Sequence, residues 1–144
     1  MKSISGLIKE FEEIISTRTD EQAIEFLFSF FAEFPIPAWI KTFDKDGHIR
    51  VAKVNLAYEE AFGLDTDTVL NREIQQELNE VKEWISNDFL AIQKGGVIKL
   101  TEEVTHKDGH TIPIFSYKWP LRTLNMKGVC GIAIPDLQRD TKND

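Results

Sequence analysis

The string Lys45-Asp46-Gly47-His48 recurs as Lys107-Asp108-Gly109-His110, and each copy lies between runs of residues that favour β-strands. Glycine adopts a positive φ at low steric cost, and an Asp-Gly pair is a strong signal for a tight hairpin. Both copies therefore predict hairpin turns that join antiparallel strands.

A short helix is predicted directly after the first hairpin. Asn55 is a good N-cap, because its side-chain oxygen can accept a hydrogen bond from a free backbone N–H of the first turn. Gly63 can end the helix in the left-handed conformation. The predicted order is strand, Asp-Gly turn, strand, Asn-capped helix, glycine.

This ordered series resembles the PAS sensory domains. The matching residues near its start are Pro37, Trp39, Asp46-Gly47, Asn55-x-Ala57-Tyr58-Glu59 and Phe62-Gly63. Further matches are Glu102-Glu103-Val104, Asp108-Gly109, Trp119-Pro120-Leu121 and Gly128-Val129-x-Gly131. The segment between Gly47 and Asn55 is slightly longer than in that family, so the first hairpin is expected to be longer. The resemblance implies a five-stranded sheet crossed by a long helix, and a role in signal transduction.

The composition limits the classes of partner. The 144 residues include 17 Lys plus Arg and 24 Asp plus Glu, and the net charge of −7 disfavours nucleic acid and anionic membranes. Cys130 is the one cysteine in the sequence, so no internal disulfide is expected. The sequence indicates neither a secretory signal nor a membrane span, which predicts a cytoplasmic protein.

Two helices are predicted ahead of Pro35. The first is amphipathic, with one apolar stripe made of Ile4, Leu7, Ile8, Phe11, Ile14 and Ile15. Thr19 and Gln22 predict a capping box for the second helix. That helix should end at Phe34, because proline disfavours helical geometry in the residue before it.

The second helix carries more phenylalanine than one buried stripe can hold, and such residues are sticky when left in water. Either the two helices pack on each other and on the sheet within one chain, or they pair between the subunits of a two-fold dimer. The resemblance to PAS proteins favours the dimer. Candidates for its interface are Leu7, Phe11, Ile15, Phe26, Phe28, Phe30 and Phe31.

The rest of the chain is predicted to complete an α+β fold. The polar segment 64–78 is expected to form irregular turns, with Thr66, Asp67, Thr68 and Asn71 as candidate caps of short helices. A long helix should follow and end at Gly95, with an apolar stripe of Leu78, Val81, Trp84, Ile85, Phe89 and Ile92. Three strands between Val97 and Pro135 then give a five-stranded antiparallel sheet with helices packed on one face, preceded by the two N-terminal helices.

A ligand pocket is expected between the sheet and the long helix, as in other α+β folds of this shape. Its candidate lining is Ile40, Val54, Phe62, Trp84, Ile85, Phe89, Phe115, Tyr117, Trp119 and Ile132. These side chains either surround a small apolar or aromatic ligand or simply fill the core. The sequence leaves both alternatives open.

No cofactor is expected. Haem-binding PAS domains commonly ligate iron through a histidine on or near the long helix, and the segment from Leu78 to Gln93 has none. The flavin photosensors of this family carry a reactive cysteine in the region of Asn71-Arg72-Glu73-Ile74-Gln75, which has no sulfur here. Cys130 is expected to be an ordinary small core residue.

The three histidines flank the two predicted turns. His48 and His110 each follow an Asp-Gly pair, so we expect them to be solvated. A two-residue loop at Asp108-Gly109 would point His106 and His110 to opposite faces, whereas a three-residue loop would place them opposite one another. Imidazole is the commonest metal ligand, so the three-residue loop leaves a weak metal site open as the alternative. Solvated turn histidines without a metal are the expectation.

We expect a sensory or regulatory module rather than an enzyme. A catalytic version would need Asp44 or Asp88 buried beside a donor such as Tyr117, and both aspartates are flanked by turn-like or exposed residues. The expected partners are a second copy of the chain, a small-molecule ligand, and an effector protein or downstream domain. A ligand-free interaction module is the alternative.

The sequence divides into a helical segment at 1–34, a PAS-like domain at 35–136 and a polar tail or linker at 137–144. The segment that begins at Pro135 resembles the string with which PAS domains lead into an effector helix. No effector region is recognisable before Asp144, which is expected either of a fragment or of a stand-alone module.

Overall fold

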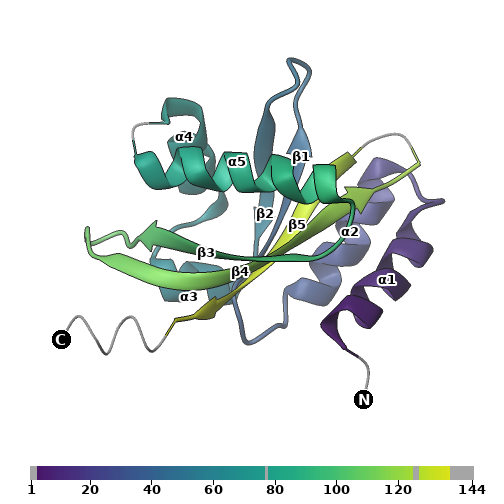
Figure 1. The fold of residues 1–144 in the computed structure, drawn as a ribbon, viewed down its shortest axis with the longest axis horizontal. Coiled ribbons are helices and arrows are strands. Elements are labelled where there is room, and N and C mark those ends of the chain that lie inside the picture. The colour runs from purple at the N-terminus through teal and green to yellow at the C-terminus, as the bar shows by residue number, and fades with distance from the viewer. Residues whose placement is uncertain (1–2, 77, 125–126, 137–144) are drawn as a thin grey trace.

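The protein is built on one antiparallel sheet (Figure 1). The computed structural model describes residues 3–76, 78–124 and 127–136. The sheet order is β2-β1-β5-β4-β3, and the strands are β1 Ala38–Phe43, β2 Ile49–Val54, β3 Ile98–Thr105, β4 Thr111–Arg122 and β5 Lys127–Pro135. The predicted five-stranded antiparallel sheet is confirmed. The tail expected at 137–144 lies outside the described residues.

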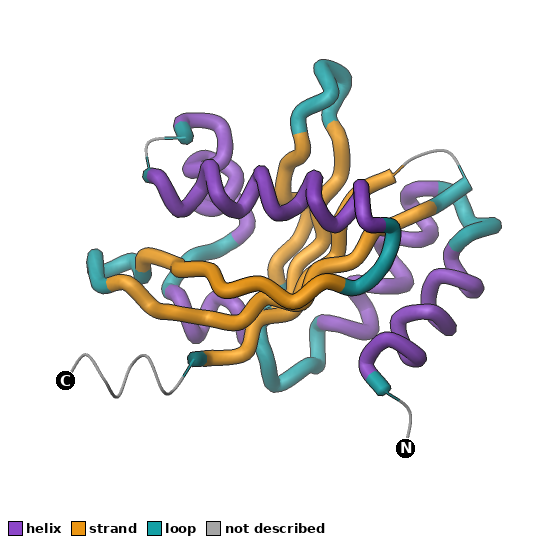
Figure 2. Tube along the Cα trace, in the orientation of Figure 1, coloured by secondary structure: helices purple, strands orange, loops and turns teal. Residues whose placement is uncertain are grey.

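Helices cover both faces of the sheet (Figure 2). On the outer face lie α1 Ile4–Ile15 and α2 Asp20–Phe31. The inner face is covered by α3 Leu56–Phe62, α4 Thr66–Gln75 and α5 Asn79–Lys94. Each face has its own hydrophobic cluster, so the strands send alternate side chains into two cores. In the part of the chain that the structure describes, no helix has the length and apolar character needed to cross a bilayer.

Both predicted hairpin turns are present. In the first, the Asp44 N–H donates to the His48 carbonyl at 2.9 Å, and the Gly47 N–H donates to the Asp44 carbonyl at 3.0 Å. The same two bonds recur in the second hairpin. Gly47 has φ of 83° and Gly109 has φ of 99°, the left-handed region that glycine tolerates. Each turn is therefore a three-residue loop that ends in a left-handed glycine.

A register shift interrupts the pairing of β1 with β2 between Ile40 and Lys41. Ile40 lies opposite Lys53, whereas Lys41 lies opposite Val51, so β2 contains one extra residue. Because of this bulge, Val51 and Val54 both reach the inner core although they are three positions apart. The bulge adds one residue to β2 of the first hairpin.

Asn55 caps α3 as predicted and also ties together segments far apart in the chain. Its Oδ1 accepts hydrogen bonds from the Tyr58 N–H at 3.0 Å and the Ala38 N–H at 2.9 Å. Its Nδ2 donates to the carbonyls of Phe31 at 2.9 Å and Ile36 at 3.0 Å. One buried side chain thus joins the end of α2, the start of β1 and the first turn of α3.

The N-terminal helices pack on the outer face within a single chain. Thr19 and Gln22 form the predicted capping box at the start of α2. The helix ends at Phe31 rather than Phe34, and the chain then leads into β1. Much of the apolar surface of these two helices is therefore buried within one chain, which was one of the two arrangements expected from the sequence.

The seven residues expected at a dimer interface differ in exposure. Ile15 and Phe31 are buried in the outer core, so the expectation that they face a second copy is corrected. Leu7 is 42% exposed and Phe30 is 41% exposed. The half-buried remainder is Phe11, Phe26 and Phe28.

The segment after Gly63, expected to form irregular turns, contains the helix α4, and that prediction is wrong. Asp65 caps this helix by accepting a hydrogen bond from the Thr68 N–H at 2.8 Å. Only Val69 and Glu73 are buried in α4. Two buried positions give too little apolar periodicity for the sequence to reveal a helix.

The long helix α5 ends at Gly95 as predicted but turns a different face to the sheet. Its buried residues are Val81, Trp84, Asp88 and Ala91. Phe89 is 45% exposed and lies beside Phe43, with ring centroids 5.9 Å apart. The placement of Phe89 in the core is therefore wrong, because the helical period brings its neighbour Asp88 inward instead.

Candidate functional site

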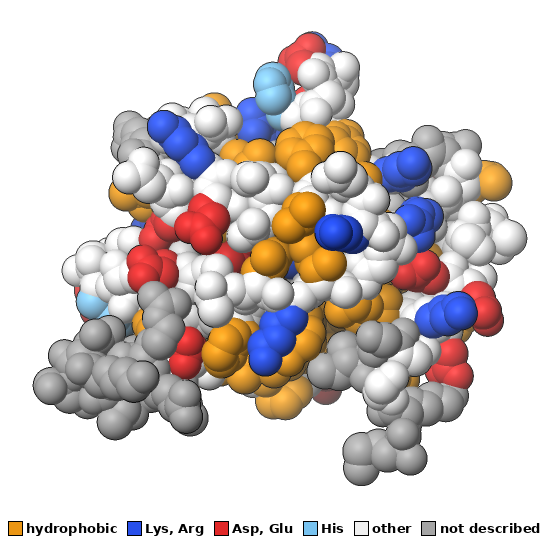
Figure 3. Space-filling model, viewed as in Figure 1, with side chains coloured by type: hydrophobic (Ala, Val, Ile, Leu, Met, Phe, Trp, Pro, Cys, Tyr) orange, Lys and Arg blue, Asp and Glu red, His pale blue; other side chains and the backbone are white. Residues whose placement is uncertain are grey.

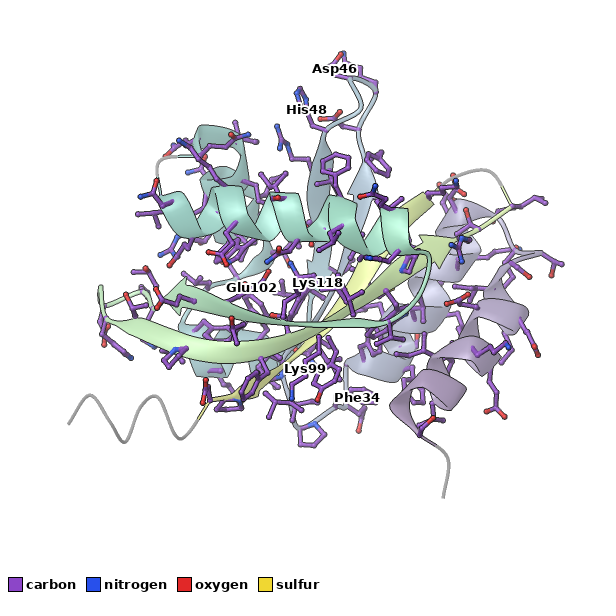
Figure 4. The ribbon with its side chains drawn as sticks, viewed as in Figure 1. Phe34, Asp46, His48, Lys99, Glu102 and Lys118 are labelled. Carbon is purple, nitrogen blue, oxygen red and sulfur yellow. The ribbon has the colours of Figure 1, made fainter. Side chains whose placement is uncertain are left out.

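The inner core contains a set of charged side chains, here called the ionic chain. Its members are Lys41, Glu73, Asp88, Glu102 and Lys118, each at most 4% exposed. They come from β1, α4, α5, β3 and β4, so they connect two helices with three strands. Figure 4 shows Glu102 and Lys118 in the space between α5 and the sheet.

Asp88 lies at the centre of the ionic chain. Its Oδ2 is 2.7 Å from Lys41 Nζ, and its Oδ1 is 2.9 Å from Lys118 Nζ. Lys41 Nζ also lies 2.8 Å from Glu73 Oε2, and Lys118 Nζ lies 2.7 Å from Glu102 Oε2. Charges therefore alternate in the order Glu73, Lys41, Asp88, Lys118, Glu102, and each cation lies between two anions.

Neutral groups complete the two ends of the ionic chain. Glu102 accepts hydrogen bonds from Ser116 Oγ at 2.6 Å and from Asn87 Nδ2 at 2.9 Å. Glu73 Oε1 accepts from the Val51 N–H at 2.7 Å, which satisfies a backbone donor of the edge strand β2. Glu73 Oε2 accepts no hydrogen bond of good geometry, although Lys41 Nζ lies close to it. Glu73 is thus the least satisfied member.

The anions keep Lys41 protonated inside the core. Burial alone would lower the pKa of Lys41, but the charges of Asp88 and Glu73 and its short contacts with both carboxylates raise the pKa above its ordinary value. A raised folded-state pKa contributes stability at every pH below the ordinary lysine value, and that stability is lost only as the pH rises through the folded pKa. Lys41 is therefore charged throughout the neutral range.

The inner core has little free space. The cavity there has a volume of about 20 Å³, which is enough for about one water molecule. It is lined by Trp39, Lys41, Val51, Val54, Tyr58, Val69, Trp84, Glu102, Val104, Ile114 and Lys118. Pockets that enclose a drug-sized ligand measure roughly 300–1,000 Å³. This cavity is therefore small, and its wall is partly charged.

Four of the ten residues expected to line a pocket lie in the inner core. Val54 and Trp84 are on the cavity wall. Phe62 and Ile85 belong to the same hydrophobic cluster but not to the wall. Trp84 also donates its indole N–H to the Glu103 carbonyl at 2.9 Å, which joins α5 to β3.

The other six lie elsewhere, and their expected place on the cavity wall is corrected. In the outer core are Ile40, Tyr117, Trp119 and Ile132. Phe115 is half-buried beneath Lys99, whose Nζ is 4.4 Å from the ring centroid, and Phe89 is exposed. Figure 3 shows hydrophobic side chains gathered below β3 and β4. The most apolar face of β4 thus turns to the outer side of the sheet, away from the cavity.

The sequence prediction missed the ionic chain because the inner face of β4 carries polar residues. Ser116 and Lys118 alternate with Tyr117 and Trp119 along this strand. A polar face opposite an apolar one normally meets water. Here helices cover both faces, so the polar face is buried as well. One signal in the sequence could have revealed this burial. The sequence predicts more helices than are needed to cover one face of the sheet, so the second face is also expected to be covered.

The groups considered for catalysis are not brought together. Asp88 is buried but bound by two lysines, Asp44 is exposed at the first turn, and Tyr117 lies on the outer face. The phenol beside the ionic chain is that of Tyr58, and burial raises its pKa. Cys130 is buried in the outer core, where burial raises the pKa of its thiol and disfavours the thiolate.

Solved structures similar to this chain include PAS and LOV domains. The PAS domain of a protein from Colwellia psychrerythraea is 20% identical, with a TM-score of 0.59 over 81% of this chain and 98% of that one. A PAS domain from a two-component sensor histidine kinase is 10% identical, with a TM-score of 0.59 over 82% of this chain and 100% of that one. An RNA-binding light-oxygen-voltage receptor is 14% identical, with a TM-score of 0.59 over 88% of this chain. The match spans 36% of that receptor.

No protein-family model matches the sequence, and no curated protein does. The structural matches nevertheless confirm the PAS fold expected from the resemblance. The same fold therefore occurs in a light-oxygen-voltage receptor and in a two-component sensor histidine kinase.

Proposed function

We propose that this protein is a sensory or regulatory module that acts through dimerisation or through a partner protein. The observation that carries the proposal is the PAS fold with two helices docked on the outer face of its sheet. In this account, a signal changes the packing between the sheet and these helices. The ionic chain supports it, because it couples α4 and α5 to three strands of the same sheet.

The inner core is proposed to hold neither flavin nor haem. An apolar or aromatic ligand, one of the alternatives expected from the sequence, would have to displace paired charges, and an unpaired buried charge costs several kcal/mol. The small charged cavity is better suited to one water or a very small polar molecule. The size of this cavity favours a ligand-free interaction module as the second candidate function.

Catalysis is not part of the proposed function. Asp88 accepts from two ammonium groups, so its carboxylate is not available as a general base. Nucleic acid is also not a proposed partner, because the chain carries a net charge of −7. The RNA-binding receptor has a similar fold, but a shared fold does not indicate that this chain binds RNA.

The proposed interface is the exposed apolar part of α1 and α2. The rings of Phe11 and Phe30 lie 4.6 Å apart, and those of Phe30 and Phe34 lie 4.8 Å apart. Leu7 adds a side chain that is 42% exposed. Contiguous apolar groups of this kind mark interaction surfaces when they stay exposed on a folded monomer.

Native mass spectrometry of the untagged chain is expected to show a dimer without the mass of a flavin or a haem. The variant L7E should be monomeric, because a carboxylate in an apolar interface carries a desolvation cost. Ile74→Glu is the matched control, since Ile74 is 57% exposed on α4, away from the proposed interface. A monomeric native chain would contradict the dimer, and a co-purified flavin or haem would contradict the proposed interior.

A further inference from the structure

The hairpin between β3 and β4 brings two histidines face to face. The His106 N–H donates to the His110 carbonyl at 2.7 Å, and the Gly109 N–H donates to the His106 carbonyl at 2.9 Å. This is the three-residue loop, the alternative that places the two imidazoles opposite one another. Their rings are stacked, with centroids 4.7 Å apart and an interplanar angle of 19°.

Asp108 completes a cluster of three metal-ligating groups. One ligand atom from each of His106, Asp108 and His110 lies within 4.8 Å of the other two. His106 Nδ1 is 3.3 Å from Asp108 Oδ1, and His110 Nδ1 contacts the same oxygen. Ligands held at about 2.0–2.1 Å from a tetrahedral zinc ion are themselves about 3.4 Å apart. The side chains are therefore close to a chelating arrangement.

The hydrogen bonds of His106 set the state of its ring. The Asp108 N–H donates to His106 Nδ1 at 3.0 Å, so this nitrogen carries a lone pair and points into the loop. A metal ligand must be an unprotonated nitrogen. A bound ion would replace the amide hydrogen as the partner of His106 Nδ1, and this ring would not need to change its tautomer. His110 Nδ1 contacts the Asp108 carboxylate and therefore carries the hydrogen of that contact, so a bound ion would displace this proton.

The end of α3 holds His106 in place. A Cβ built on Gly63 would lie 3.2 Å from His106 Cε1, so the ring packs against this glycine. The Lys107 N–H donates to the Phe62 carbonyl at 3.0 Å, which fixes the loop to the same helix. Such contacts orient a ligand before an ion binds.

We propose that this hairpin binds one divalent transition-metal ion, best matched by zinc, through Nδ1 of His106, Nδ1 of His110 and an oxygen of Asp108. Imidazole suits zinc, copper and nickel, whereas calcium and magnesium prefer oxygen ligands alone. Water completes the coordination, because the side chains of Asp108 and His110 are 60% and 57% exposed. Bound zinc fastens the hairpin next to the end of α3. This site is separate from the signalling role proposed above.

The β1–β2 hairpin provides a matched control in the same molecule. It has the same loop and nearly the same string, but Asp44 stands where the other hairpin has His106. Its cluster of Asp44, Asp46 and His48 therefore has one imidazole rather than two. Figure 4 shows Asp46 and His48 at the projecting tip of this hairpin. Fewer nitrogen ligands make it a poorer zinc site.

Isothermal titration of zinc into the untagged chain, treated first with a chelator, tests the proposal. One ion per chain should bind, and H110A should weaken the affinity by about tenfold or more, because only two protein ligands remain. H106A should act in the same way, whereas H48A should leave the affinity unchanged. Cobalt in place of zinc should give the visible absorption of a tetrahedral site in the native chain and lose it in H110A.

Absence of saturable zinc binding at millimolar concentration overturns the proposal. An equal loss of affinity in H48A and H110A also overturns it, because binding would then be non-specific. His106 packs against Gly63, so H106A can perturb the fold. The His110 side chain is 57% exposed, so H110A is not expected to perturb the fold. If circular dichroism shows that H106A is misfolded, the result for H110A decides the outcome.

Discussion

Replacement of Lys118 by methionine is expected to lower the free energy of unfolding by about 3–5 kcal/mol, because it leaves Glu102 buried without its cation and Asp88 with only one of its two cations, Lys41. Lys118 is 1% exposed and its Nζ lies within 2.9 Å of both Asp88 and Glu102. Methionine fills a similar volume, so the loss reports the missing charge rather than a cavity. Urea denaturation followed by tryptophan fluorescence measures the change.

Lys99→Met is the matched control for this variant. Lys99 lies on β3 with its Nζ over the half-buried ring of Phe115, and it has no place in the ionic chain. Its replacement should change stability by at most about 0.5 kcal/mol. Adding Glu102→Gln to Lys118→Met should recover part of the loss, because the interior then regains its original formal charge. Equal effects of the two single lysine variants would show that the ionic chain is not formed.

Asn55→Ala is expected to destabilise the protein by about 3 kcal/mol or more, because it removes a helix cap and leaves several buried backbone groups without partners. The side chain is 1% exposed and makes four hydrogen bonds. The Ile36 carbonyl loses its donor and the Ala38 N–H loses its acceptor, whereas the Phe31 carbonyl keeps the Phe34 N–H as a donor. The same urea titration measures this loss.

Asp65→Ala measures the loss of a helix cap alone, without the loss of hydrogen bonds to distant segments that Asn55→Ala also causes. Asp65 caps α4 through Thr68 in an exposed position, so its removal should cost only about 1 kcal/mol. Asn55→Ala should therefore be clearly the more damaging of the two. Equal losses would mean that Asn55 acts as a helix cap and nothing more.

Local turn and cap chemistry made most of the fold predictable from the sequence. The glycines at 47, 63, 95 and 109 all adopt the positive φ that ends a helix or turns a hairpin. The capping residues Asn55 and Thr19 act as expected. These signals need only a few neighbouring residues, so the order of elements follows from them. The helix α4 was missed because its two buried residues give no apolar stripe.

The contents of the inner core were not predictable in the same way. Burial of a lysine depends on acids that reach it from other elements, and the sequence separations within the ionic chain are large: Lys41 and Asp88 are 47 residues apart. The strongest apolar alternation, in Phe115, Tyr117 and Trp119, marks the outer face of β4. The sequence pattern correctly identified the apolar face of β4. It did not indicate which face of the sheet the long helix covers, and the position of that helix decides where the cavity lies.

Nitrogen-15 NMR of the lysine side chains reports whether the ionic chain is formed in solution. Ammonium protons in water exchange too fast to be observed, whereas buried, hydrogen-bonded ammonium protons exchange slowly. Slowly exchanging ammonium signals are expected at neutral pH from Lys41 and Lys118, and each should disappear in the corresponding methionine variant. A spectrum in which neither lysine is protected from exchange would contradict an interior held together by paired charges.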